Sequence, residues 1–483
     1  MMKLDLDTAT RGDLWQQVVG EMERYHDQIS EVRVAPVLDI GSIRDRLSAF
    51  DFERGMPPSE AVCFAVNGMW RDQVHTPHPR YFGLFNPAPT SMGIAGDALV
   101  AAFNPQIAAW SHSPFASEVE RHLILALGRR FGYPGDAIDG VFASGGAEAN
   151  HTAVLCALTH ASPRFAREGV RAMASSPLLY VSALSHDSVL KAARLCGLGT
   201  DAVRIVAVDS RLRLAPETVG AAMERDRAAG NAPIMLVATA GSTSAGVIDD
   251  IAGLGAIARR HGAWFHVDAA WGGMAALLPE LYSLLDGIGQ ADSITFDAHK
   301  SLSTPMGAGI FLTRHPDILE HTFRVNADYM PRDGASQAGN MIDPFAHSMQ
   351  WSRRFTGLKL FLSLAVAGWE GYAGALRHQV AMGERLCRQA RADGWKVVND
   401  TPLPLALLTD GGGVDAAAVA QAVVASGEAW VSSVRLPSGA AAIRACITNY
   451  RTQPADVDAL IASLGRARAA LGSASGGAQR TRA

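Results

Sequence analysis

Short apolar stretches alternate with helix-length stretches through the middle of the chain, from residue 80 to residue 340. Parallel strands need a long crossover connection, usually a helix, between one strand and the next. This alternation therefore predicts an α/β domain with a mostly parallel sheet. The strands are expected at Gly140–Ala143, Leu178–Ser182, Val203–Val208, Ile234–Thr239, Trp264–Val267, Ile294–Phe296 and Gly309–Leu312.

The N-terminal segment has a different pattern. Leu14, Val18, Met22 and Tyr25 recur at helical spacing, and an irregular stretch follows them. Such a segment buries little apolar surface alone. We therefore expect residues 1–79 to form a helical arm that packs on another domain or another subunit.

The C-terminal part is first helical and then mixed. A long helical stretch, Phe355–Trp369, precedes strand candidates at Trp395–Val398, Leu403–Leu408, Trp430–Val434 and Ala442–Ile447. The end of the chain is poor in bulky apolar residues. The predicted division is thus an arm, a large domain over 80–345, a small α+β domain over 346–470 and a disordered tail over 471–483.

Composition and charge narrow the class of ligand. The chain has 483 residues, of which 48% are hydrophobic, enough for a sizeable core and for more than one domain. Its 43 Lys and Arg residues against 47 Asp and Glu residues give a net charge of -4, so the basic field that binds nucleic acid is absent. A small-molecule ligand is therefore expected.

Cysteine usage and the chain start indicate a cellular location. The five cysteines are odd in number and form no CxxC pair, which argues against a disulfide framework or a zinc site, and we expect no metal. The N-terminus has no apolar core typical of a signal peptide, and no uncharged apolar run reaches about 18 residues. We expect a cytoplasmic protein without a membrane partner.

Lys300 and Asp268 are the residues that most strongly indicate chemistry. Lys300 follows a strand candidate in the run Asp297–Ser301, and Asp268 lies at the end of another in the run His266–Gly273. Pyridoxal phosphate (PLP) needs an amine to hold its aldehyde as a Schiff base and a carboxylate to keep its pyridine nitrogen protonated. The pair therefore suggests a PLP enzyme, although each residue alone is more often a solvated lysine or a helix cap.

Three further segments follow strand candidates. Ser144–Asn150 places glycines before a helix, which suits a phosphate site but also a plain tight connection. In Ser185–Ser188, His186 could stack on a flat ring, or the segment could simply cap a helix. Ala238–Gly246 is rich in small and hydroxyl residues, which suits close contact with a cofactor and equally a turn.

Taken together, these motifs resemble the group II PLP-dependent amino-acid decarboxylases, the family of the aromatic L-amino-acid, histidine and glutamate enzymes. The resemblance runs in order from His78–Gly83 through the segments above to Trp351–Phe355 and Ile443–Cys446. It implies the type I PLP fold of the aspartate aminotransferase kind. That fold has a seven-stranded, mostly parallel sheet in the large domain, a small C-terminal domain and an N-terminal helical arm. It also implies a homodimer with active sites at the interface.

The resemblance also implies roles for individual residues. Lys300 would hold the cofactor as a Schiff base, Asp268 would pair with its pyridine nitrogen, and His186 would stack over its ring. Tyr329 would lie on a loop that covers the site. The other residues implied to contact the cofactor are Gly145, Gly146, Ala147, Thr243, Ala270 and His299, and those implied to contact the substrate are Phe85 and Arg444. A structural ion pair is an alternative role for the arginine.

The implied reaction is the decarboxylation of an L-amino acid to its amine through a quinonoid intermediate. Electrons left by the departing carbon dioxide would enter the pyridine ring, and Tyr329 or His186 would protonate the carbon. One alternative is oxygen-dependent decarboxylation and deamination to an aldehyde, and retention of both residues argues against it. A second alternative is an aminotransferase, which shares the fold and the lysine and aspartate. A non-catalytic PLP-binding protein would be expected to lack one of that pair.

The side chain of the substrate is open. Relatives that act on aromatic amino acids carry bulky residues where this chain has Gln106 and Ala108, and an aromatic residue where it has Leu84. Ala147 replaces a hydroxyl residue that is common after the two glycines, which bears on cofactor affinity. Aromatic amino acids, glutamate or aspartate, and 2,4-diaminobutyrate are candidates, because one methylene changes specificity by only about 1–3 kcal/mol.

Overall fold

The computed structural model describes residues 4–325 and 341–480. The chain divides into two compact units. The larger unit consists of residues 85–384 and 398–407, and the smaller one of residues 1–84, 385–397 and 408–483. The N-terminal segment thus belongs to the same unit as most of the C-terminal part. The domain boundaries expected at residues 79, 345 and 470 remain predictions.

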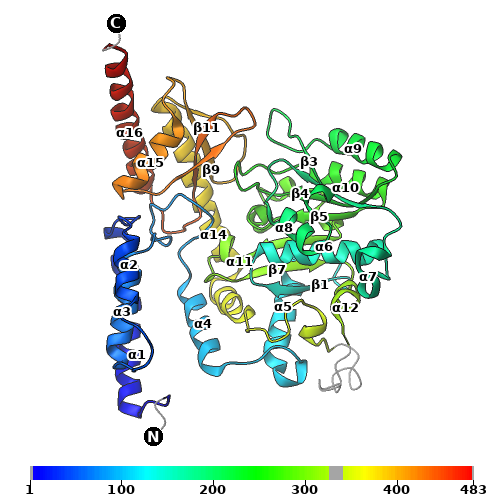
Figure 1. Ribbon diagram of the computed structural model, residues 1–483, viewed down its shortest axis with the longest axis horizontal. Coiled ribbons are helices and arrows are strands. Elements are labelled where there is room, and N and C mark those ends of the chain that lie inside the picture. The colour runs from blue at the N-terminus through cyan, green and yellow to red at the C-terminus, as the bar shows by residue number, and fades with distance from the viewer. Residues whose placement is uncertain (1–3, 326–340, 481–483) are drawn as a thin grey trace. The chain divides into compact units, whose positions relative to one another are not determined.

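A seven-stranded sheet forms the centre of the larger unit (Figure 1). The strands lie in the order β1-β7-β6-β5-β4-β2-β3. All neighbours are parallel, except that β7 is antiparallel to both β1 and β6. This confirms the α/β fold with a mostly parallel sheet. The bounds are β1 (Asp139–Ala143), β2 (Pro177–Ser182), β3 (Val203–Val206), β4 (Ala232–Thr239), β5 (Trp264–Asp268), β6 (Ser293–Asp297) and β7 (Gly309–Thr313).

Helices cover both faces of this sheet. Trp264 and Phe265 are consecutive in β5 and therefore point to opposite faces. The ring of Trp264 meets His160 of α6 with centroids 5.4 Å apart, whereas Phe265 lies against Gly255 of α10. Figure 1 shows α8 on the side of α6 and α9 on the side of α10. The bounds are α6 (Gly146–Ala161), α8 (Ser188–Leu195), α9 (Pro216–Ala228) and α10 (Ile251–His261).

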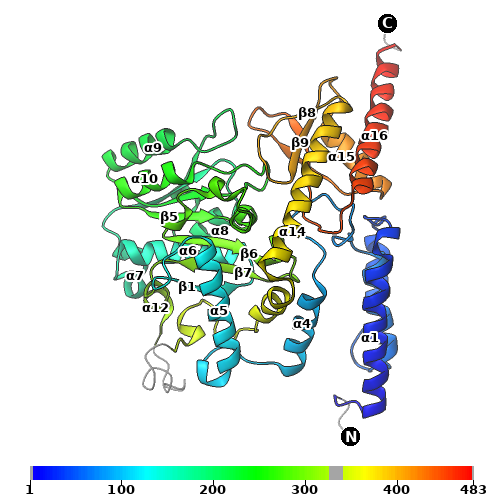
Figure 2. The ribbon, with the colours of Figure 1, turned by 180° about the vertical axis from the view of Figure 1, so that it is seen from behind.

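The long helix α14 (Gly357–Ala392) contains a break, and Figure 2 shows it from behind. Gly368 has φ 63° and ψ 175°, a conformation that only glycine adopts readily, so the helical hydrogen bonds are interrupted there. The stretch predicted as helical from residue 355 to 369 ends at this break. Other helices of the larger unit are α4 (Ser91–Phe103), α5 (Pro114–Arg130), α7 (Phe165–Glu168), α11 (Ala298–Ser301) and α12 (Ile318–Phe323).

The smaller unit joins the N-terminal helices to a four-stranded sheet of order β10-β11-β9-β8, although residues 405–407 of β9 are counted with the larger unit. Backbone hydrogen bonds connect its distant parts: Val34 donates to Gly427, and Cys446 donates to Phe82. The helix α16 includes most of the segment predicted as a tail. The bounds are α1 (Thr8–Gln28), α2 (Ile40–Leu47), α3 (Pro58–Arg71), α15 (Ala416–Ser426), α16 (Pro454–Arg480), β8 (Trp395–Val397), β9 (Leu405–Asp410), β10 (Ser432–Arg435) and β11 (Ala441–Cys446).

Over residues 4–325 and 341–480, no helix is both long and apolar enough to span a membrane.

Candidate active site

The candidate residues gather at one edge of the large sheet. Asp268 ends β5, Asp297 ends β6, and Thr239 ends β4. These strands are parallel, so their carboxyl ends lie on the same side, where open α/β sheets bind ligands. A cavity of 260 Å³ lies at this edge. It is lined by Phe85, Ser144, Gly145, Gly146, Ala147, Asn150, His186, Thr239, Gly241, Thr243, Asp268, Ala270, Trp271, Asp297, His299, Lys300 and Met306.

Lys300 lies on the short helix α11, directly after β6. Its Nζ lies 2.9 Å from Oδ2 of Asp297, whose side chain is 1% exposed. The same Nζ lies 5.6 Å from the centre of the Phe85 ring. About a fifth of the lysine side chain remains accessible, because 21% of it is exposed. The structure thus presents an amine to the cavity and places a buried carboxylate beside it.

Asp268 is the second carboxylate that lines this cavity, and it is 8% exposed. Its Oδ1 accepts a hydrogen bond of 3.1 Å from the backbone N–H of Ala270, and its Oδ2 accepts one of 2.8 Å from Nδ2 of Asn150. A donor on each oxygen fixes the orientation of the carboxylate. The site therefore holds a fixed anion that can pair with a protonated ring nitrogen.

The glycine-rich turn links β1 to α6 at the same edge. A Cβ atom at Gly146 would lie 2.8 Å from Oδ2 of Asp297, closer than real side chains approach. Next to it, Gly309 of β7 has no room either, because a Cβ there would lie 2.4 Å from the carbonyl carbon of Gly145. The turn is thus packed backbone against backbone at the start of a 16-residue helix. A helix start of this kind suits an anion such as phosphate.

His186 and two aromatic rings form other parts of the wall. The Nδ1 of His186 accepts a hydrogen bond of 3.1 Å from the backbone N–H of Ser188, which fixes the ring. Phe85 stacks on Trp271 with centroids 4.4 Å apart and an interplanar angle of 19°. Flat, apolar surfaces of this kind suit contact with a flat ring or an apolar side chain.

His299 precedes the lysine and is 6% exposed. Its Nδ1 accepts a hydrogen bond of 3.2 Å from the backbone N–H of Ala308. Burial lowers the pKa of His299, and the nearby carboxylate of Asp297 opposes that shift. The imidazole is therefore expected to be neutral near pH 7 and able to donate from Nε2 to an anion.

The roles predicted for two residues are not tested by the structure. Tyr329 lies outside the described residues. Arg444 belongs to the smaller unit, where its side chain is 1% exposed and its Nη1 donates to the carbonyl oxygen of Gly83. Burial lowers the pKa of this arginine. The roles implied for both residues remain predictions.

Asn150, Asp297 and Trp271 line the cavity but received no role from the sequence. Each lies in one of the motifs that follow the strands, close in sequence to a residue with a predicted role. Asp297 stands three positions before Lys300, which places both on one side of a helical turn. Asn150 stands in the first turns of α6 after the two glycines. For Asp297, this helical spacing was the signal that could have identified it.

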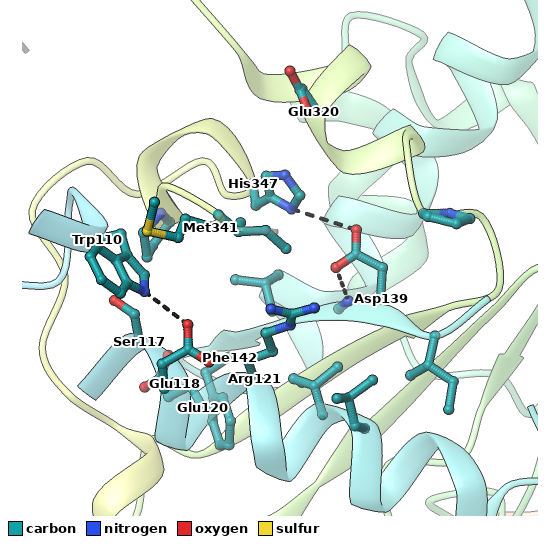
Figure 3. Close-up of a pocket in the computed structure, with 18 of the residues that line it drawn as sticks. Trp110, Ser117, Glu118, Glu120, Arg121, Asp139, Phe142, Glu320, Met341 and His347 are labelled. Atoms are coloured by element: carbon teal, nitrogen blue, oxygen red, sulfur yellow. Dashed lines mark hydrogen bonds and ion pairs between the residues drawn. The ribbon is translucent and has the colours of Figure 1, made fainter. Parts of the chain in front are cut away.

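A second cavity, of 370 Å³, lies beside α5 and the edge strand β1 (Figure 3). In its wall, Nδ1 of His347 lies 3.5 Å from Oδ2 of Asp139, and Trp110 donates to Glu118 over 2.8 Å. No lysine is among the described residues that line it. Within the described ranges, no cluster of three or more His, Cys, Asp or Glu residues could hold a metal ion.

The donor set of the smaller cavity fits PLP. Lys300 supplies the amine for its aldehyde, and Asp268 supplies a carboxylate for its ring nitrogen. The crowded glycine turn leaves no room for side chains where its phosphate would approach the helix start. Phe85, Trp271 and His186 offer flat surfaces. No other cofactor class is suggested by this combination of residues.

Comparison with known proteins agrees with this combination. Residues 61–405 match the family model described as "Pyridoxal-dependent decarboxylase conserved domain". An aromatic-L-amino-acid decarboxylase of Bacillus atrophaeus is 28% identical over 408 residues, which are 84% of this chain and 82% of the relative. An L-2,4-diaminobutyrate decarboxylase of Rhizobium meliloti (strain 1021) is 34% identical over 281 residues, 58% of this chain and 54% of the relative.

Solved structures give the same result for the fold. The crystal structure of mouse CSAD in apo form superposes with a TM-score of 0.88 at 25% sequence identity. The match covers 96% of this chain and 99% of that one. The seven-stranded sheet and the arrangement of its helices are therefore those of a known enzyme fold.

Proposed function

The chain belongs to the pyridoxal-dependent decarboxylase family, and from this membership we propose that Lys300, Asp268 and His186 carry its reaction. The enzyme decarboxylates an L-amino acid to the corresponding amine and carbon dioxide, with PLP as cofactor. The observation that carries the residue assignment is that Lys300 and Asp268 line one cavity at the carboxyl edge of the sheet. When bound, PLP supplies the electron sink that accepts the electrons of the broken carbon–carbon bond.

Lys300 binds the cofactor in this proposal and takes up or releases a proton at Nζ. Its neighbour Asp297 lies 2.9 Å away and holds the side chain in place through an ion pair while the amine is free. The side chain is only partly exposed, which limits the access of water to the reacting amine. Among the described residues, Asp297 is the only one that forms an ion pair with Lys300.

Asp268 stabilises positive charge on the ring nitrogen of the cofactor. Because this carboxylate is 8% exposed, its attraction for a cation is weakly screened. The backbone N–H of Ala270 and the amide of Asn150 keep both oxygens oriented. Removal of the carboxylate would lower the rate of the chemical step more than the affinity for the substrate.

His186 lies on the wall formed after β2 and is oriented by the backbone N–H of Ser188. Because Nδ1 accepts that bond, Nε2 is the nitrogen that can carry or deliver a proton. We propose that His186 packs on the cofactor ring, and that either it or Tyr329 protonates the substrate carbon. The remaining cofactor contacts of the proposal are Gly145, Gly146, Ala147, Thr243, Ala270 and His299, with Phe85 and Arg444 toward the substrate.

A second copy of the chain is proposed to cover the N-terminal helices. Neither α1, α2 nor α3 contains a buried residue, and Trp15 of α1 is 60% exposed. An apolar groove of 320 Å³ lies along α1 and α3, lined by Val18, Glu21, Met22, Tyr25, Val62, Ala65, Val66, Met69, Trp70 and Gln73. In a twofold dimer the same apolar face of each subunit meets at one contact, so a single contact would bury both faces. A homodimer is thus the proposed state. We also propose a cytoplasmic location, which the five cysteines without a CxxC pair support.

A substrate screen tests the proposed reaction. Purified, PLP-loaded protein would be incubated with the twenty L-amino acids, 2,4-diaminobutyrate and dopa, while carbon dioxide, amine, aldehyde and peroxide are recorded together. Amine and carbon dioxide in equal amounts, without peroxide, are expected for one or a few substrates. Aldehyde with peroxide, or a keto acid without carbon dioxide, would instead identify the oxidative or transaminating alternative.

A further inference from the structure

Asn150 lies directly behind the carboxylate of Asp268, and it takes no part in the mechanism above beyond that contact. We propose that Asn150 is a positioning residue, which holds the carboxylate of Asp268 correctly oriented toward the ring nitrogen of PLP. This inference rests on the proposed role of Asp268. Asn150 is only 2% exposed. It would therefore act through Asp268 rather than on the substrate.

The amide of Asn150 is fully used by its neighbours. Its Nδ2 donates to Oδ2 of Asp268 over 2.8 Å and to Oγ of Ser188 over 2.8 Å. Its Oδ1 accepts a hydrogen bond of 2.7 Å from Oγ1 of Thr295. Thr295 and Ser188 are 0% and 4% exposed, so water does not compete for these bonds. The side chain therefore has a single favourable orientation.

A longer chain of hydrogen bonds continues from Asn150 into the core. His266 places Nε2 3.0 Å from Oδ1 of Asn150 and Nδ1 2.8 Å from Oγ of Ser293. Ser293 in turn accepts a hydrogen bond of 2.8 Å from Nε1 of Trp264. All these groups are buried. The chain thus runs from an indole, through serine, histidine and asparagine, to the carboxylate.

The two ends of this chain fix its direction. An indole N–H can only donate, and an ionised carboxylate can only accept. Asn150 must therefore turn its NH₂ group toward Asp268, which leaves its oxygen facing His266. His266 then carries its proton on Nε2 and accepts from Ser293 at Nδ1. Burial lowers the pKa of His266 to about 4, so the neutral ring that this arrangement requires is the stable form near pH 7.

The sequence builds this chain from the period of two in neighbouring strands. Trp264, His266 and Asp268 alternate along β5 and point to one face. Ser293 and Thr295 do the same on β6, where they pair with His266 and Asp268. The helix α6 packs on that face and brings Asn150 to it. Every donor in the chain is therefore supplied by regular secondary structure, which positions side chains more rigidly than loops do.

The expected consequence is a coupling between Asn150 and the cofactor. Hydrogen bonds to a carboxylate stabilise its charged form. Without the Asn150 donor, Asp268 would lose the hydrogen bond that orients its Oδ2 and would pair less well with a protonated ring nitrogen. Both the affinity for PLP and the protonation of the bound ring would then change, in addition to the rate of reaction.

Asn150→Asp tests this inference, because aspartate has nearly the same shape and still accepts from His266 and Thr295. The matched control is Asn399→Asp. Asn399 is also buried in the larger unit, and its Nδ2 donates two bonds of 2.9 Å, to the carbonyls of Ala245 and Leu405. Three properties would be measured: thermal unfolding of each apo protein, the Kd for PLP, and the pH midpoint of the visible absorption of the bound cofactor.

The inference predicts that Asn150→Asp raises the Kd for PLP by about tenfold or more and shifts the pH midpoint. Asn399→Asp would lower the unfolding temperature but keep the Kd within about twofold of wild type. A Kd and a midpoint for Asn150→Asp that equal those of the control would overturn the inference. A wild-type protein that binds no PLP would overturn the proposed function itself, which is a different result.

Thr295→Val keeps the inference testable if Asn150→Asp does not fold. Valine has the shape of threonine but cannot donate the hydrogen bond to Oδ1 of Asn150. The hydrogen bond from Nδ2 of Asn150 to Asp268 remains possible. The Kd for PLP should rise about threefold, in the same direction and by less than for a change at Asn150 itself. An unchanged Kd and an unchanged pH midpoint for Thr295→Val would contradict the inference.

Discussion

Lys300 and Asp297 form an ion pair inside the cavity, with Nζ 2.9 Å from Oδ2. They stand three positions apart, at the end of β6 and the start of the next helical turn. The carboxylate is almost completely buried and the amine is partly exposed. Before the cofactor binds, the carboxylate of Asp297 thus holds the Lys300 amine in an ion pair, which must break before the amine can react with an aldehyde.

Asp297→Asn is therefore expected to speed the loading of PLP onto the apo protein. The amide keeps the shape of the side chain but removes the charge that pairs with Lys300. Stopped-flow absorbance should show a loading rate several times that of wild type at pH 7. Asp97→Asn is the control, since it removes the partner of Lys359, which lies 3.3 Å away. Slower loading for Asp297→Asn would indicate that this carboxylate accepts the proton of Lys300 instead.

Gly146→Ala is expected to weaken PLP binding about tenfold. The new Cβ would lie 2.8 Å from Oδ2 of Asp297, so the turn or the carboxylate must move. Gly68→Ala in α3 is the matched control, because its Cβ would meet nothing within 4 Å. Titration of the two apo proteins with PLP measures the difference. Equal affinity for both variants would show that the tight turn does not shape the cofactor site.

The stability of the apo protein should depend on pH through His266. The pKa of its side chain is about 4 when folded, whereas the ordinary value is 6.5. Below pH 6.5 the unfolded state binds a proton that the folded state does not, so stability falls as the pH drops from 6.5 to 4. The contribution of this one residue is about 3 kcal/mol.

His266→Gln tests that contribution, because glutamine does not titrate. The fall in unfolding temperature between pH 7 and pH 4.5 should be smaller for the variant than for wild type. Other groups contribute to the pH dependence of both proteins equally, so the difference between them isolates His266. Parallel curves for the two proteins would refute the assignment.

If the groove along α1 and α3 is the dimer contact, charged residues placed in it should prevent dimer formation. Met22 and Met69 are 41% and 52% exposed, and both line it. The double change Met22→Asp and Met69→Asp would bury two carboxylates at the contact and should yield monomers in light scattering at micromolar concentration. Leu195→Asp, at an apolar residue of α8 that is 63% exposed, should leave the mass unchanged. Dimers that persist in the double variant would place the contact elsewhere.

The fold could be predicted from the sequence because its signals are local. Each buried strand is a short apolar run, and helix-length segments separate the runs, so all seven strands were placed. The helix α14 shows the limit of this approach. Helical periodicity predicted its first part to residue 369, but the second part continues after Gly368, and a single glycine did not reveal that the helix resumes.

The site could be predicted only in part, because its residues act through space. PLP chemistry requires a lysine and a carboxylate, and the motifs around Lys300 and Asp268 indicated that both lie at strand ends. PLP chemistry does not require an asparagine, so the residue type of Asn150 gave no signal. Its role depends on the packing of α6 over β5, which joins positions 118 apart in the sequence. No local pattern encodes a contact of that range.

Reduction of the PLP-loaded protein with sodium borohydride, followed by digestion and mass spectrometry, tests the central claim most directly. Reduction fixes the cofactor to the lysine that holds it. The chain has only five lysines, so the assignment is unambiguous: Lys3, Lys191, Lys300, Lys359 and Lys396. The account predicts one modified peptide, with the cofactor on Lys300. Modification of any other lysine in its place, or of none, would contradict the site assignment.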